Sequence, residues 1–157
     1  MLLINYFKED NKTTEEIKVV MYGRVGSKEY LDNLLEWEEK QSTNHPDWQV
    51  CKSFYDYGSG LKIQPKLKQL LAYVKNEKID ALVVANGSRL IRRADLFIQI
   101  IASLRKEGVH IYFTDEDVWL DDENVFVQML KKMLIMEIES RQMSERIKYG
   151  MKVYRNK

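Results

Sequence analysis

The sequence has little of the residues that build disulfide-bonded or metal-binding proteins. Its 157 residues include one cysteine, Cys51, and two histidines, His45 and His110. A single cysteine cannot form an intramolecular disulfide, and with two histidines it is too small a set for a metal cluster. We therefore expect a protein of a reducing compartment, the cytoplasm, with no metal and no cofactor.

Long hydrophobic runs are also missing. The longest apolar stretches have five or six residues, as at residues 81–85, whereas a membrane-spanning helix needs about 20. The chain starts with MLLINYFKEDNK, in which charged residues follow a short apolar start at once. This pattern is not typical of a signal peptide. The sequence predicts neither a membrane protein nor a secreted one.

The common nucleotide and zinc motifs are absent as well. There is no GxxxxGK phosphate loop, no GxGxxG after a strand and no HExxH, so nucleotide and zinc enzymes are not favoured. The acidic residues at 115–123 have the chemistry of a cation site, but carboxylates at a helix start need no metal. A phospho-receiver domain would need acids where this chain has Gly23-Arg24 and Asn86-Gly87.

The composition is that of an ordinary globular domain, with 45% hydrophobic and 31% charged residues, and the length favours one domain. The net charge of +1 hides an uneven distribution along the chain. Residues 141–157 contain six basic residues and one acidic residue, so the remainder of the chain is acidic. A basic tail of this kind indicates contact with nucleic acid, or simply a solvated terminal helix.

The apolar pattern predicts an α/β fold. Continuous runs at residues 17–22, 48–55, 79–85 and 109–113 indicate strands buried on both faces, and segments with helical spacing lie between them. This alternation predicts three layers, with a mostly parallel sheet of four or five strands flanked by helices. We expect an N-terminal extension at 1–16, the α/β domain at 17–120, and a long helix with a basic tail at 121–157.

The long C-terminal helix is predicted from about Asp122 to Tyr149, with Gly150 as its stop. Apolar residues recur along it at alternating spacings of three and four residues. Such a stripe packs either on its own domain or on a second copy, and we favour a homodimer. The methionines assigned to this dimer interface are Met129, Met133, Met136 and Met143.

Arginines occupy the predicted strand ends. Arg24 follows the first strand, and Arg89, Arg92 and Arg93 follow the third. The carboxyl ends of parallel strands share one edge of the sheet, and guanidinium groups bind phosphate oxygens through paired hydrogen bonds. The sequence therefore predicts a site at this edge for an anion such as a phosphodiester. The predicted DNA contacts continue on the long helix at Arg146, Lys148 and Lys152.

Several segments, in order, resemble the serine site-specific recombinases of the resolvase/invertase group. VVMYGRVGS (19–27) is similar to the family's Tyr-Ala-Arg-Val-Ser-Thr motif, and FYDYGSG (54–60) to its Asp-x-Gly-x-Ser-Gly loop. ALVVANGSRLIRR (81–93) resembles its strand followed by Asp-Arg-Leu-x-Arg, and Gly108-Val109 fits the turn into its fourth strand. IESRQMSERIKYG (138–150) resembles its long helix. The resemblance spans roughly residues 17–150.

This resemblance implies a catalytic domain that cleaves and rejoins DNA strands. In the family a serine hydroxyl attacks the scissile phosphate, arginines stabilise the charge on the phosphoryl group, and no metal is required. The family's arginines correspond to Arg24, Arg89 and Arg92, and its Glu-Arg pair on the long helix to Glu145-Arg146. The family normally continues beyond this helix into a separate DNA-binding domain.

Four positions depart from the family pattern. Gly26 occupies the nucleophile position, with Ser27 one residue later, and Leu34 occupies the position of a glutamine. Ser88 replaces an aspartate and Gln64 an arginine. Two interpretations stay open: a recombinase that works through Ser27, or an inactive pseudo-recombinase that keeps dimerisation and DNA binding for a regulatory or structural role. We expect cleavage to be weak or absent.

Overall fold

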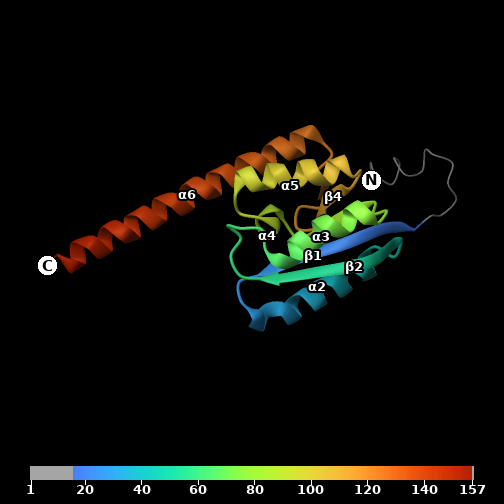
Figure 1. The fold of residues 1–157 in the computed structure, drawn as a ribbon, viewed down its shortest axis with the longest axis horizontal. Coiled ribbons are helices and arrows are strands. Elements are labelled where there is room, and N and C mark those ends of the chain that lie inside the picture. Colours follow the sequence, from blue (N-terminus) through green and yellow to red (C-terminus); the bar gives the residue numbers. More distant parts are fainter. Residues whose placement is uncertain (1–15, 157) are drawn as a thin grey trace.

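A computed structural model describes residues 16–156 and has one five-stranded sheet with the order β2-β1-β3-β4-β5 (Figure 1). The first four strands are parallel and β5 is antiparallel to β4, which confirms the predicted mostly parallel sheet. The predicted extension at 1–16 lies outside the described residues except for Glu16. The strands are β1 (Ile17–Val25), β2 (Trp48–Tyr57), β3 (Ala81–Val84), β4 (His110–Phe113) and β5 (Val118–Trp119).

Helices cover both faces of the sheet and complete the predicted three layers. Helix α2 lies on one face, whereas α3 and α5 lie on the other, and α6 runs beside α5 before it projects beyond the domain (Figure 1). None of the helices in the described range is long and apolar enough to cross a membrane. The helices are η1 (Lys28–Tyr30), α2 (Leu31–Asn44), α3 (Pro65–Asn76), α4 (Gly87–Leu90), α5 (Ala94–Lys106) and α6 (Glu123–Arg155).

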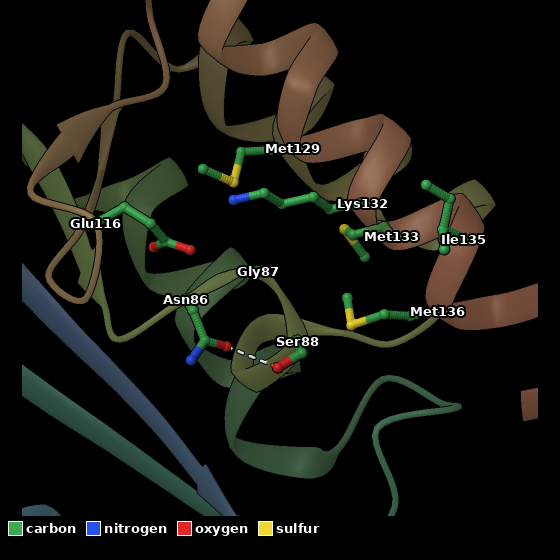
Figure 2. A pocket seen from close by; sticks show the side chains of 9 residues that line it. All are labelled: Asn86, Gly87, Ser88, Glu116, Met129, Lys132, Met133, Ile135 and Met136. Atoms are coloured by element: carbon green, nitrogen blue, oxygen red, sulfur yellow. Dashed lines mark hydrogen bonds between the residues drawn. The ribbon is translucent and has the colours of Figure 1, made fainter. Parts of the chain in front are cut away.

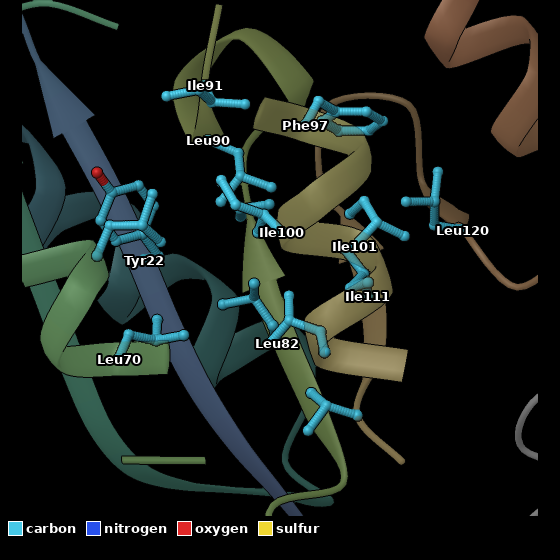
Figure 3. Packing of buried hydrophobic residues seen from close by; sticks show 14 of the residues in the cluster. Tyr22, Leu70, Leu82, Leu90, Ile91, Phe97, Ile100, Ile101, Ile111 and Leu120 are labelled. Atoms are coloured by element: carbon cyan, nitrogen blue, oxygen red, sulfur yellow. The ribbon is translucent and has the colours of Figure 1, made fainter. Parts of the chain in front are cut away.

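Alternate residues of the central strands enter two separate apolar clusters. Tyr22 and Leu82 belong to the larger cluster, under α3 and α5, while Met21 and Val83 belong to the smaller one on the opposite face. Figure 3 shows Tyr22 and Leu82 among the side chains of the larger cluster, together with Leu70 of α3 and Ile100 of α5. Because both faces are covered, both sets of side chains are apolar, and the strands read as continuous hydrophobic runs.

Helix α6 begins where the sequence predicts and continues further. The Asp122 side chain accepts hydrogen bonds from the backbone N–H groups of Asn124 and Val125, at 2.8 and 3.3 Å. The helix then passes through Gly150 to Arg155, so the predicted stop at Gly150 is wrong. A glycine inside a helix costs only about 1 kcal/mol relative to alanine, and the residues that follow Gly150 are not helix breakers.

The methionine stripe divides between two environments. Met129 and Met133 are 7% and 2% exposed and belong to the core of their own domain, so assigning them to a dimer interface was wrong. The sulfur of Met133 lies 3.5 Å from where a Cβ of residue 87 would be, so this part of α6 packs on α4 of its own domain. Met136 and Met143 are 43% and 65% exposed. From Ile138 to Asn156 every residue of the chain is exposed.

Candidate active-site cleft

A cleft of about 1050 Å³ opens at the carboxyl edge of the parallel strands. One wall comes from the end of β1, the loop after β2 and the segment around α4, and the other comes from α6. Arg24, Arg89, Arg92 and Arg93, the arginines predicted to follow the first and third strands, all line this cleft. The walls join segments far apart in the sequence because parallel strands with crossover helices end at the same edge.

Arg24 ties two of these segments together. Its Nη1 donates to the carbonyl of Gly58 at 2.9 Å, and its Nη2 donates to the carbonyl of Ser88 at 2.6 Å. The residue is 3% exposed, and its Nε atom is buried without a hydrogen-bond partner among the described residues. The guanidinium group therefore holds the loop after β2 against α4 while it lies on the floor of the cleft.

The positive charges of the cleft act on one another. Burial lowers the pKa of Arg24, and the neighbouring charge of Arg92 lowers it further, with a smaller contribution from Arg89. Like charges raise one another's free energy unless an anion lies between them. A bound phosphate would offset this repulsion, and the cleft is open to solvent beside Arg89 and Arg92, which are both exposed.

Gly60 allows the loop to approach two of the arginines. A Cβ atom at this position would lie 2.6 Å from Nη2 of Arg24 and 2.7 Å from Cγ of Arg92. The backbone is held there, because the N–H of Arg92 donates to the Gly60 carbonyl at 2.7 Å. Any larger residue would displace the loop or both side chains. Sequence reasoning assigned Gly60 to the loop motif without this packing role.

The same loop is fixed from behind by two buried polar side chains. Asp56, at the end of β2, accepts hydrogen bonds from the Tyr22 hydroxyl and from the N–H groups of Lys66 and Leu67, all at 3.0 Å. Burial raises the pKa of Tyr22 strongly, and the Asp56 carboxylate raises it further. Gln64, which the sequence resemblance aligns with an arginine of the family, donates from Nε2 to the Ser59 carbonyl at 2.7 Å.

Ser27 lies outside the group of residues that line the cleft, whereas Gly26 belongs to it. The Ser27 hydroxyl donates to Glu29 at 3.0 Å, and the Ser27 backbone is extended, with φ −144° and ψ 161°. Neighbouring residues of extended backbone point to opposite sides. Leu34, which the sequence resemblance aligns with a glutamine of the family, packs on Gly23, with Cδ2 at 2.6 Å from where a Cβ of residue 23 would lie.

Of the other basic residues predicted to contact DNA, only some line the cleft. Arg93 lines the cleft and forms an exposed ion pair with Asp95 at 2.6 Å. From α6, Lys148 lines the cleft, while Arg146 and Lys152 are exposed on the helix outside it. In the family's Glu-Arg pair, Glu145 lines the cleft and Arg146 does not.

Sequence reasoning missed Glu137, which connects α6 to α5. Its carboxylate accepts a hydrogen bond from the N–H of Ala94 at 3.1 Å and pairs with Arg141 of α6 at 2.7 Å. The spacing of Glu137 and Arg141, four residues apart on one helix, is a visible signal for an ion pair. The contact with Ala94, 43 residues away, has no such signal.

A second, smaller cavity of about 330 Å³ lies between α4 and α6, next to the cleft. Figure 2 shows its walls, with Met133 and Met136 of α6 facing Gly87 and Ser88 of α4. Among the residues that the structure describes, no group of three or more His, Cys, Asp or Glu side chains is arranged to hold a metal ion.

The sequence matches a family model, the resolvase N-terminal domain, over residues 19–157. It is also 31% identical over 107 residues to the protein L103 of Acanthamoeba polyphaga mimivirus, whose name describes a resolvase. That alignment covers 68% of this chain and 54% of the viral protein. The chain thus spans about half the length of this curated relative.

Solved structures with the same fold are recombinase domains. The N-terminal catalytic domain of TP901-1 integrase matches with a TM-score of 0.62 and 19% identity, covering 80% of this chain and 98% of that domain. A resolvase family site-specific recombinase from Streptococcus pneumoniae matches with a TM-score of 0.61 and 17% identity, covering 90% and 99%.

A third structure is more similar in sequence. The C-terminal catalytic domain of ISC1926 TnpA, an IS607-like serine recombinase, is 26% identical, with a TM-score of 0.55 and coverage of 62% of this chain and 70% of that domain. The first two structures, at lower identity, support the fold alone. Together with the match to the family model along most of the sequence, these findings show that the chain belongs to the resolvase family of serine site-specific recombinases.

Proposed function

We propose that this resolvase-type domain binds a DNA phosphodiester in the arginine-lined cleft, as part of a site-specific recombination protein. The observation that carries the proposal is the meeting of Arg24, Arg89 and Arg92 at one edge of the sheet. Guanidinium groups gathered around an open cleft suit a phosphate, to which they donate paired hydrogen bonds. Because the proposed substrate is DNA, we place the domain in the cytoplasm.

We propose a homodimer through the exposed part of α6, which pairs into a tetramer when two DNA sites are joined. From Ile138 to Asn156 every residue is exposed, and Met143, Ile147 and Met151 are each more than half exposed although they are apolar. Their spacing of four residues places them along one side of the helix. Arg146, Lys148 and Lys152 are each adjacent in the sequence to one of these apolar residues and are proposed to contact DNA phosphates.

Cleavage would be a transesterification in which a serine oxygen forms a bond to phosphorus while the bond from phosphorus to the 3′ oxygen breaks. The serine proton ends on that 3′ oxygen, and the arginines stabilise the charge that builds on the phosphoryl oxygens. The nucleophile must lie within about 3 to 3.5 Å of phosphorus. Ser27 is the candidate nucleophile, but its hydroxyl donates a hydrogen bond to Glu29 and lies outside the cleft.

The placement of Gly26 and Ser27 supports a second candidate function. A domain with arginines around the phosphate but no hydroxyl at the attacking position would bind DNA and dimerise without cutting. Such a pseudo-recombinase would act as a regulatory or structural partner. Electrostatic stabilisation by arginines cannot replace the missing attack, because it lowers the barrier of a step that has no nucleophile.

DNA binding is tested with a fluorescent duplex titrated at several salt concentrations. We expect Arg89→Ala and Arg92→Ala each to weaken binding about tenfold and to reduce the slope of affinity against salt by about one. Lys75→Ala removes an equal charge from an exposed position of α3, away from the cleft, and serves as the control. Equal affinities for all three variants and the unmodified protein would refute the proposed phosphate site.

A further inference from the structure

We propose that Asn86, oriented by Asp115, is the positioning residue that sets how α4 presents Arg89 to a bound phosphate. This inference rests on the proposed DNA binding and adds a residue pair outside the arginine set. Asn86 stands at the end of β3 as the N-cap of α4, and Asp115 follows the end of β4. The pair links two neighbouring strand ends behind the cleft.

The Asn86 side chain holds the first turn of α4. Its Oδ1 accepts hydrogen bonds from the N–H of Arg89 at 3.0 Å and from the hydroxyl of Ser88 at 2.7 Å; Figure 2 shows the second of these as a dashed line. Helix α4 has only four residues. One turn cannot sustain itself by helix propensity, since nucleation is unfavourable, so the cap and the tertiary contacts must hold it.

Asp115 determines which way the Asn86 amide faces. Nδ2 of Asn86 donates to Oδ2 of Asp115 at 2.7 Å. A carboxylate only accepts hydrogen bonds, so the amide must turn its nitrogen to Asp115 and its oxygen to α4. The backbone fixes Asp115 in turn, because its N–H donates to the carbonyl of Ala85 at 2.9 Å and continues the pairing of β4 with β3.

The position of α4 matters to all three phosphate-binding arginines. Arg89 lies within this helix, and the carbonyl of Ser88, also within it, accepts from Nη2 of Arg24 at 2.6 Å. Arg92 comes two residues after the last residue of the helix, and its N–H donates to the carbonyl of Gly60 at 2.7 Å. A shift of α4 would therefore move Arg89 and break the contact that holds Arg24.

The experiment compares Asn86→Ala, Asn86→Asp and the exchanged pair Asn86→Asp with Asp115→Asn. The exchange reverses the hydrogen bond between residues 86 and 115 and keeps the net charge, while the carboxylate introduced at position 86 still accepts from α4. We expect Asn86→Ala to weaken binding of the labelled duplex about fivefold, from the loss of a helix cap. Asn86→Asp alone places a second carboxylate opposite Asp115 and should weaken DNA binding at least as much. The exchanged pair should bind DNA with an affinity within about twofold of that of the unmodified protein.

Glu116→Gln is the matched control for charge, because it neutralises the exposed carboxylate next to Asp115, and it should leave the Arg89 amide unchanged. Hydrogen exchange of that amide, followed by NMR, gives a readout that needs no DNA. Its protection should fall in Asn86→Ala and return in the exchanged pair. Unchanged protection and affinity in Asn86→Ala would overturn the proposal, and so would failure of the exchange to restore either. If Arg89→Ala and Arg92→Ala leave DNA affinity unchanged, the proposed function fails and the positioning role in DNA binding falls with it.

Discussion

At the residue scale, the positions of Gly26 and Ser27 decide what chemistry is open to the domain. Gly26, which the sequence resemblance aligns with the family's nucleophile, lies in the cleft, and Ser27 lies outside it with its hydroxyl hydrogen-bonded to Glu29. A displacement of a reacting group by about 1 Å costs on the order of a hundredfold in rate. Ser27 would have to change both its backbone conformation and its hydrogen bond to reach a phosphate.

We therefore expect weak or absent DNA cleavage, and no gain in the variant Gly26→Ser large enough to match an active recombinase. A Cβ at Gly26 would meet no atom within 4 Å, and the Leu34, Gln64 and Ser88 side chains are engaged in contacts elsewhere. The measurement incubates the full-length protein with supercoiled DNA that carries its own attachment site, followed by denaturing gels. A protein covalently joined to a 5′ end, and lost in Ser27→Ala, would show that Ser27 does act as the nucleophile.

At the element scale, α6 has two halves with different surroundings. Its first half is anchored by Met129 and Met133 in the core and by Glu137 on the start of α5. Its second half has no core contacts among the described residues. It nevertheless carries apolar side chains, since Met143 and Ile147 are 65% and 56% exposed. Exposed apolar side chains along one side of a projecting helix are typical of a helix that packs on a partner.

We expect Met143→Asp and Ile147→Asp each to weaken the free energy of dimerisation by about 3 kcal/mol, because a charge would be buried without a partner. The proposed homodimer should then dissociate. Sedimentation velocity at protein concentrations in the tens of micromolar provides the measurement. Gln142→Asp adds the same charge to an exposed polar position of this helix and should leave the dimer intact. A monomeric unmodified protein at these concentrations would contradict the prediction. Met133→Asp is unsuitable, since it would disrupt the core.

At the scale of the whole molecule, stability should depend on pH through a contact between β4 and the segment before α6. Nδ1 of His110 lies 2.9 Å from Oδ1 of Asp121. This hydrogen bond raises the pKa of His110 above its usual value, with further contributions from the charges of Asp121 and Asp80, while burial acts in the opposite direction.

A raised pKa in the folded state means that the contact stabilises the protein fully below the unfolded pKa of about 6.5, and that this stability is lost as pH rises through the folded pKa. Asp121→Asn should thus lower the free energy of unfolding by about 0.5 kcal/mol at low pH, a partly exposed pair being weak, and by less above the folded pKa. The measurement is urea unfolding of the unmodified protein and of Asp121→Asn at pH values below and above the folded pKa of His110. Glu116→Gln is the control. A difference that grows as pH rises would show the sign to be wrong.

Local patterns in the sequence were enough to predict the architecture. Continuous β-branched runs predicted the four parallel strands, and Asp122 before a proline-free apolar segment predicted the start of α6. The arginines after the first and third strands predicted a shared cleft, because all parallel strands end at one edge. These features depend on the neighbouring residues and on rules of chain topology, and both can be read from the sequence.

The atomic arrangement of the site was decided only by tertiary packing. Arg24 donates to the carbonyls of Gly58 and Ser88, which are separated from it by 34 and 64 positions in the sequence. Asn86 and Asp115 are separated by 29 positions. Gly60 is needed because two arginine side chains lie against it. Met129 and Met143 follow the same spacing along α6, yet one is buried and the other exposed. Spacing along a helix determines which side chains share a face, whereas the place where the helix leaves its domain determines which of them have a neighbour.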